Sequence, residues 1–124
     1  MARARTVLGL VAAGMLILSS FAHSILGWKG LSEELAKTNA PANLVTGLKV
    51  GWMYGGVVML VLGVILIPLF TRRLRGEEVS GLPAAAVSVA YLGFGAWALL
   101  ASDLSPFFMG FMVQGVLLAV AAPR

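Results

Sequence analysis

The sequence contains no cysteine and only one histidine, His23. Disulfides, thiolate metal sites and thiol redox chemistry are therefore excluded, because each of them needs a cysteine sulfur. The sequence also contains no pair of carboxylates inside an apolar run, no cluster of metal ligands and no glycine loop of the phosphate-binding kind. We therefore expect no catalytic residue, no metal site and no cofactor, and the protein is predicted not to be an enzyme.

Charged residues are also scarce. They make up 11% of the 124 residues, whereas hydrophobic residues make up 60%; ordinary soluble domains carry about a quarter charged residues. A chain of this length cannot bury so much apolar surface in a single soluble core. Disorder is excluded as well, because it requires low hydrophobicity and high charge. The composition therefore predicts a membrane protein.

Four stretches of the chain carry no charged residue, and each is between 20 and 24 residues long: 6–28, 50–71, 79–102 and 104–123. A helix needs about 20 apolar residues to cross a hydrocarbon layer of about 30 Å. Helices also satisfy their own backbone hydrogen bonds in lipid. The sequence therefore predicts an all-α, integral membrane four-helix bundle that forms a single domain over residues 1–124, with spans at about 6–28, 43–70, 82–102 and 105–123.

Glycine and proline suggest where these helices begin and end. The segment 27–30 has the glycines of a helix stop, so the first span is expected to end there. Residues 31–39 are then expected to form a short, separately capped helix on the outer membrane surface. Pro41 is predicted near the start of the second helix and Pro68 in its last turn. The last two spans are expected to form a tight hairpin, because only residues 104–106 separate them.

The distribution of lysine and arginine predicts the orientation. Positive residues on short loops are retained on the cytoplasmic side. With the N-terminus inside, that side carries Arg3, Arg5, Arg72, Arg73, Arg75 and Arg124. The outer side carries Lys29, Lys37 and Lys49, partly balanced by Glu33, Glu34 and Asp103. We expect both termini in the cytoplasm of a bacterial-type inner membrane, with Arg72, Arg73 and Arg75 as a topology anchor.

The net charge of +4 is explained by this topology, so the expected partner is the lipid bilayer rather than nucleic acid. The basic, apolar N-terminal segment also has the outline of a secretory signal peptide. Its apolar run is long for one, and small residues suited to cleavage are poorly placed around residues 21–24. The segment is therefore predicted to remain as the first span.

Small residues recur on one face of each span. Helices in lipid associate through such faces, because leucine and lipid tails are equally apolar. The predicted packing positions are Gly47, Gly51 and Gly55 on the second span, Ala86, Ala90 and Gly93 on the third, and Gly110 on the fourth. The glycine run of the second span has two interpretations, packing within one chain or contact between two chains. Either a homo-oligomer or a larger membrane complex is expected.

Polar and aromatic residues inside the spans form a candidate intramembrane site: His23, Tyr54, Trp97, Tyr91 and Gln114. At a rise of about 1.5 Å per residue, the first three should share one layer and the last two should lie near the midplane. An intramembrane ionisable residue is a functional candidate, so His23 could relay protons or ligate haem iron. The structural alternative is a hydrogen bond from His23 to Tyr54, a serine or a backbone carbonyl. Tyr91 and Gln114 could likewise have a purely structural role, in which their hydrogen bonds join one helix to another.

Three functions agree with this pattern. The favoured one is a non-catalytic structural or accessory subunit that acts through helix packing. The alternative is a small oligomeric transporter or channel with a polar path formed by His23, Tyr54, Tyr91 and Gln114. A second alternative is a redox accessory protein associated with haem or quinone, whose quinone pocket would be lined by Trp97, Phe107, Phe108 and Phe111.

Overall fold

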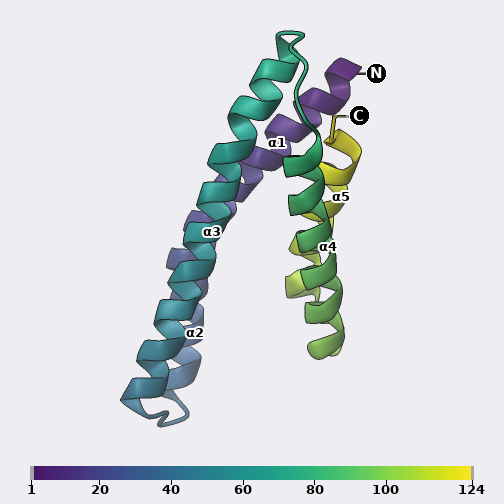
Figure 1. Ribbon diagram of the computed structural model, residues 1–124. Helices are drawn as coiled ribbons and strands as arrows, with labels where there is room; N and C mark the ends of the chain where they lie inside the picture. Colours follow the sequence, from purple (N-terminus) through teal and green to yellow (C-terminus); the bar gives the residue numbers. More distant parts are fainter. Residues whose placement is uncertain (1, 124) are drawn as a thin grey trace.

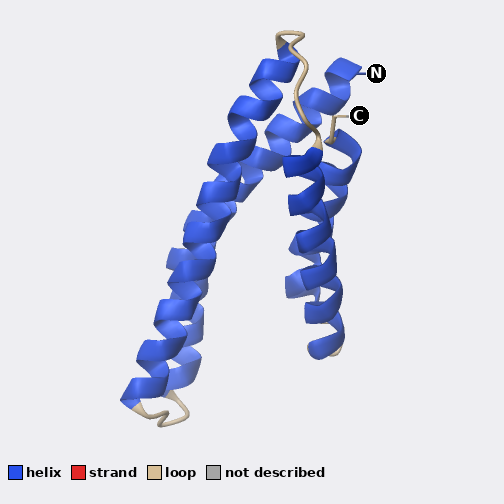
Figure 2. Ribbon diagram, viewed as in Figure 1, coloured by secondary structure: helices blue, strands red, loops and turns tan. Residues whose placement is uncertain are grey.

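The computed structural model describes residues 2–123, which fold into helices joined by short loops. The elements in chain order are α1 (Ala2–Phe21), the π-helical turn η1 (Ala22–Gly27), α2 (Trp28–Ala36), α3 (Ala42–Leu74), α4 (Leu82–Ala101), the 3-10 turn η2 (Pro106–Phe108) and α5 (Met109–Ala121). No strand occurs among residues 2–123 (Figure 2). The predicted all-α fold is confirmed.

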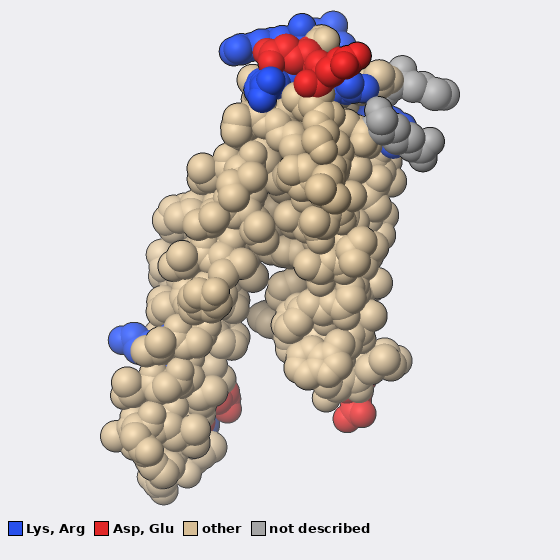
Figure 3. All heavy atoms as spheres, in the orientation of Figure 1, with Lys and Arg blue, Asp and Glu red and all other residues tan. Residues whose placement is uncertain are grey.

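The helices form two antiparallel hairpins that diverge from one end of the molecule (Figure 1). In the first hairpin α1 packs along α3, and in the second α4 packs along α5. The hairpins are joined mainly by α1 and α5, whereas α3 and α4 make little contact. The start of α1, the loop between α3 and α4, and the end of α5 all lie at the end where the hairpins meet. Toward the opposite end the space-filling view shows a crevice between the two hairpins (Figure 3).

The core lies where the hairpins meet. Its fully buried large side chains are Leu16, Leu66, Phe70 and Leu118, which come from α1, α3 and α5. Gly9 faces the ring of Phe70, and a Cβ atom at Gly9 would collide with that ring. The missing side chain thus lets a large aromatic residue of α3 pack directly on the backbone of α1.

Three helical segments are long and apolar enough to cross a membrane: Ala2–Ala36, Ala42–Leu74 and Leu82–Ala101. A fourth apolar segment, Pro106–Ala121, is shorter. At a rise of about 1.5 Å per residue it extends over about 24 Å.

The predicted helix stop at residues 27–30 is wrong. The chain stays helical from Ala2 to Ala36, and Gly27 has φ of −63° and ψ of −44°. The glycine serves a close contact instead, because a Cβ atom there would lie 2.9 Å from Cζ2 of Trp52 on α3. The helix ends only in the turn after Ala36, where Asn39 has a φ of 51°, a left-handed conformation that asparagine tolerates better than most residues.

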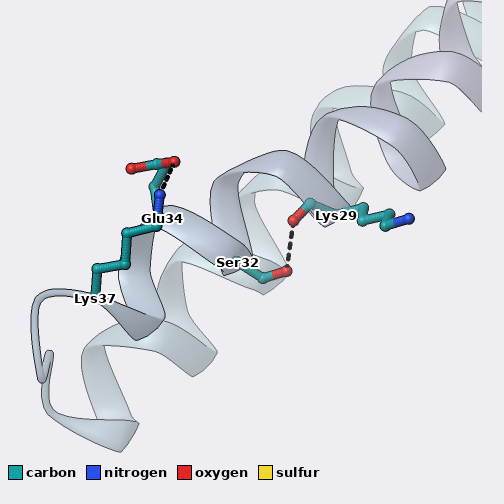
Figure 4. A network of polar contacts seen from close by, with 4 residues as sticks. All are labelled: Lys29, Ser32, Glu34 and Lys37. Carbon is teal, nitrogen blue, oxygen red and sulfur yellow. Dashed lines mark hydrogen bonds and ion pairs between the residues drawn. The ribbon is translucent and has the colours of Figure 1, made fainter.

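The segment after the expected stop continues the first helix. Ser32 donates a hydrogen bond from Oγ to the carbonyl of Lys29 at 2.9 Å, and Nζ of Lys37 pairs with Oε1 of Glu34 at 2.6 Å (Figure 4). Ser32 therefore bonds back into the helix rather than capping a new one. The ion pair is exposed and adds little stability. The expected separate surface helix is replaced by α2, which packs against α3.

Charged side chains gather at the end where the hairpins meet (Figure 3). Nε of Arg72 pairs with Oε2 of Glu77 at 2.6 Å, and Nε of Arg5 donates to the carbonyl of Val120 at 2.7 Å. A cation at the C-terminal carbonyls of a helix interacts favourably with the helix dipole. Arg5 thereby ties the start of α1 to the end of α5.

Candidate functional site

The crevice between the hairpins contains two adjoining cavities. The first, of 570 Å³, lies between α1 and α5 and is called the α1–α5 cavity below. The second, of 980 Å³, lies between α3 and the second hairpin and is called the α3–α4 groove. Five residues line both: His23, Met59, Tyr91, Phe107 and Phe111. The opening between the hairpins is visible in Figure 3.

His23 and Trp52 are joined by two hydrogen bonds and a ring stack. Nε2 of His23 lies 3.0 Å from the carbonyl oxygen of Trp52, and Nε1 of Trp52 donates to the carbonyl of His23 at 2.6 Å. The ring centroids are 4.4 Å apart with an angle of 5° between the planes. A carbonyl can only accept, so Nε2 of His23 carries a proton and donates this bond. This contact coincides with the π-helical turn η1, and such turns occur often at functional positions.

Two adjacent glycines make room for this contact. A Cβ atom at Gly55 would lie 3.1 Å from Nε2 of His23, and one at Gly56 would collide with Oγ of Ser24. Of the three packing positions expected on α3, Gly55 is the one that lies against another helix of the same chain. The bond that His23 makes is to a backbone carbonyl, that of Trp52. Iron ligation through Nε2 would require this bond to break.

Gln114 is the second polar residue of the crevice. Only 5% of its surface is exposed, and its Nε2 donates to Oγ of Ser19 on α1 at 3.1 Å. Its Oε1 has no hydrogen-bond partner among residues 2–123. Leaving a buried acceptor unsatisfied costs about 1–3 kcal/mol. Gln114 and Ser19 both line the α1–α5 cavity, so the unpartnered oxygen belongs to a side chain in the wall of this cavity.

Ser19 was missed as a site residue by the sequence reasoning. The signal was present, because Ser19 precedes His23 by one helical turn and therefore shares its face. Tyr91 was expected at the depth of Gln114, and both line the α1–α5 cavity. No hydrogen bond joins them among the described residues; Tyr91 packs instead against Phe111, with centroids 5.7 Å apart.

The other two candidates are mostly exposed. Tyr54 is 68% exposed and Trp97 is 63% exposed. Tyr54 lines the α3–α4 groove without a hydrogen bond to His23 in the described part of the chain. Trp97 packs against Phe94 and lines neither cavity. Of the aromatic set proposed for quinone, only the three phenylalanines line the groove: Phe107, Phe108 and Phe111.

The small-residue positions differ from the expectation for packing inside the chain. A Cβ atom added at Gly47, Gly51, Gly93 or Gly110 would meet nothing within 4 Å, and Ala86 and Ala90 are exposed. The four glycines therefore make no close contact with another helix of the chain, and the two alanines are left exposed. On α3 the reason is that α1 packs on a different face. A Cβ atom at Gly56 would collide with Ser24, and one at Gly63 would lie 2.9 Å from the carbonyl oxygen of Ala13.

Three of these four glycines lie along the crevice. Gly47 and Gly51 line the α3–α4 groove together with Ala90, and Gly110 lines the α1–α5 cavity. Gly93 lines neither. The glycine run was interpreted either as packing within one chain or as contact between two chains. Gly47 and Gly51 are uncovered, so for these two positions contact between chains remains available.

The described residues bring together no group of three or more histidine, aspartate or glutamate side chains that could hold a metal ion. Comparisons of the sequence with protein-family models, with curated proteins and with solved structures gave no match. The function is therefore argued from the two cavities and the residues that line them.

Proposed function

We propose that this chain is a non-catalytic, multi-pass inner-membrane protein that acts through helix packing, and that its partner is a second copy of itself. One observation carries the proposal: Gly47 and Gly51 lie one helical turn apart in the α3–α4 groove with open space where a side chain would be. In lipid, close approach through small residues is a main source of helix association. An uncovered pair of glycines on a long apolar helix is therefore suited to receive another helix.

A second copy fits this surface because both hairpins expose small residues. Gly47 and Gly51 are open on α3, and Ala86, Ala90 and Gly93 are exposed on α4. In a two-fold dimer each copy offers the same two surfaces, so α3 of one copy can pack on α4 of the other. In the described part of the chain no charged residue lines the groove, which favours an apolar helix over a charged partner.

The membrane arrangement belongs to the same proposal: four spans, with both termini in the cytoplasm. It is supported by the three segments of sufficient length and by the arginines at the end where the hairpins meet. The fourth segment, Pro106–Ala121, is short, and a short span is accommodated by local thinning of the bilayer.

The test is self-association of Gly47→Leu and Gly51→Leu in phosphatidylcholine vesicles, measured by energy transfer between donor-labelled and acceptor-labelled copies. Both variants should fold, because the added side chain meets open space, and both should associate at least about tenfold more weakly. Gly14→Leu is the matched control, because Gly14 is equally open but lies on α1 outside both cavities. It should associate like the wild type.

Unchanged energy transfer in both groove variants would contradict the proposal, and so would an equal loss in Gly14→Leu. The wild-type protein can also be extracted gently and analysed for bound proteins. If it is a monomer bound to a different membrane protein, the partner is that protein and not a second copy of this chain. In that case Gly51→Leu should release the accompanying protein.

A further inference from the structure

We infer that the α1–α5 cavity binds a neutral lipid that carries a hydroxyl group, with Gln114 and Ser19 as its polar contacts. This site is separate from the glycine pair of the α3–α4 groove, so the inference does not rest on self-association. It rests on an apolar cavity of suitable size, a buried polar atom without a partner, and the absence of charge in the cavity wall.

The cavity has the form of a small-molecule site. Its volume of 570 Å³ falls within the range of about 300–1,000 Å³ that is typical of such sites. Its apolar wall comes from both hairpins and includes Met15, Leu26, Met59, Phe107 and Val113. Such a wall accommodates any hydrocarbon chain of suitable size. The polar atoms of the cavity therefore determine which polar group the ligand carries.

The polar end of the cavity is the amide of Gln114. With Nε2 donating to Ser19, Oε1 is left without a partner. Turning the amide over would bring Oε1 to the hydroxyl of Ser19 and leave Nε2 unpartnered, because this hydroxyl reaches only one of the two amide atoms of Gln114. In either orientation one buried amide atom lacks a hydrogen bond. A ligand hydroxyl can both donate and accept, so it satisfies the amide in both orientations once the side chain turns its free atom toward the cavity.

The lining residues indicate that the ligand is uncharged. Among residues 2–123, no lysine, arginine, aspartate or glutamate lines the cavity, and an ion without a counter-charge is strongly disfavoured in an apolar site. His23 is the one basic group in the wall, and its Nε2 is already held by the carbonyl of Trp52. A phosphate or ammonium headgroup would therefore have no partner here. The chemistry fits a long-chain alcohol or another lipid whose polar group is a hydroxyl.

The experiment uses two photoreactive probes in phosphatidylcholine nanodiscs: a diazirine-bearing octadecan-1-ol, and the same diazirine hydrocarbon without the hydroxyl. The alcohol should label peptides of α1 and α5 around the cavity about tenfold more strongly than the hydrocarbon, the factor expected for one net hydrogen bond. Equal labelling by the two probes would overturn the inference, because lipid or water would then fill the cavity without selection.

Two variants test the hydrogen bond from Gln114 and the volume of the cavity separately. Gln114→Leu removes the amide at similar size and should lose the preference for the alcohol. Gly110→Leu places a side chain where the cavity wall is open; it should fold and lose labelling by both probes. Ser88→Ala is the control, because it removes a buried hydrogen bond to the carbonyl of Gly115, of 2.7 Å, at a residue that does not line the cavity.

Preference for the alcohol that persists in Gln114→Leu would overturn the role of the amide. Undiminished labelling in Gly110→Leu would place the probe elsewhere and overturn the cavity as the site. Because Gly110→Leu meets no neighbouring atom within 4 Å at its Cβ, it decides the matter even if Gln114→Leu does not fold.

Discussion

His23 and Trp52 each hydrogen-bond to the main-chain carbonyl of the other, at 3.0 Å and 2.6 Å, while their rings stack. They are 29 residues apart in sequence, on the two helices of the first hairpin. Because each side chain reaches the other's backbone, the contact sets how α3 is aligned along η1. A slip of one residue would break both bonds.

Trp52→Phe should destabilise the protein, because it keeps an aromatic ring beside His23 but removes the indole N–H. The expected loss is about 1–2 kcal/mol in the free energy of unfolding, since the carbonyl of His23 loses a partner at a partly buried position. The measurement is reversible unfolding in mixed micelles followed by helicity. Trp28→Phe is the control, because the indole N–H of Trp28 makes no hydrogen bond among residues 2–123 and its ring lies 6.0 Å from Nζ of Lys49; it should change stability by less than about 0.5 kcal/mol. Equal effects of the two substitutions would contradict the role assigned to Trp52.

Alanine substitutions should separate the two sets of glycines on α3. Gly63→Ala places a Cβ atom 2.9 Å from the carbonyl oxygen of Ala13, so it should destabilise by about 1–3 kcal/mol through overpacking. Gly51→Ala meets open space and should leave stability unchanged or raise it by up to about 1 kcal/mol, because alanine has the higher helix propensity. Unfolding midpoints of the two variants in the same detergent check this. Destabilisation by Gly51→Ala in the monomer would show that α3 packs differently.

The absence of native cysteine allows a direct test of orientation. Single cysteines introduced as Lys37→Cys and Glu78→Cys lie in or beside the turns at opposite ends of the first hairpin. If both termini are cytoplasmic, a membrane-impermeant maleimide should label Lys37→Cys in intact cells and Glu78→Cys only after lysis. The reverse pattern would invert the proposed topology. Labelling of both in intact cells would contradict the spanning of α3.

The transporter alternative leads to a different result in proteoliposomes. His23, Tyr91 and Gln114 line the same cavity, but no hydrogen bonds connect them among the described residues. The wild-type protein should therefore raise proton flux no further than empty vesicles do, because proton relay needs a continuous chain of polar groups. Proton flux that is present in the wild type and lost in both His23→Ala and Gln114→Leu would favour the transporter instead. The Ser88→Ala variant controls for a general loosening of the bundle.

The helical class and the apolar character of this protein could be predicted because both depend on local properties. Hydropathy and the absence of charge act residue by residue, so the three long apolar helices were recognisable without knowledge of their neighbours. The common location of the arginine-rich loop and the N-terminal arginines also followed, because antiparallel helices of similar length return the chain to the same end.

Which small residues make contacts was decided only by the tertiary structure. The run Gly47, Gly51 and Gly55 is the regular pattern in the sequence, yet α1 packs on Gly56 and Gly63. A glycine offers close approach on whichever face it occupies, and the crossing of the two helices selects the face. The same holds at Gly27, where the sequence suggested a helix stop and packing against Trp52 kept the helix intact.

At the polar site, too, part of the arrangement could be predicted from the sequence and part depended on the tertiary structure. Membrane depth, counted along each helix, brought Tyr91 and Gln114 to one level, and both line the α1–α5 cavity. Depth does not determine the direction in which a side chain points around the helix axis, so the pairing of Gln114 with Ser19 and of His23 with Trp52 depended on how the hairpins are rotated and joined. The sequence determined that this is a helical protein suited to a membrane, because that property adds up residue by residue. The tertiary structure decided where its crevice lies and which polar atom in it lacks a partner, because those depend on contacts between distant residues.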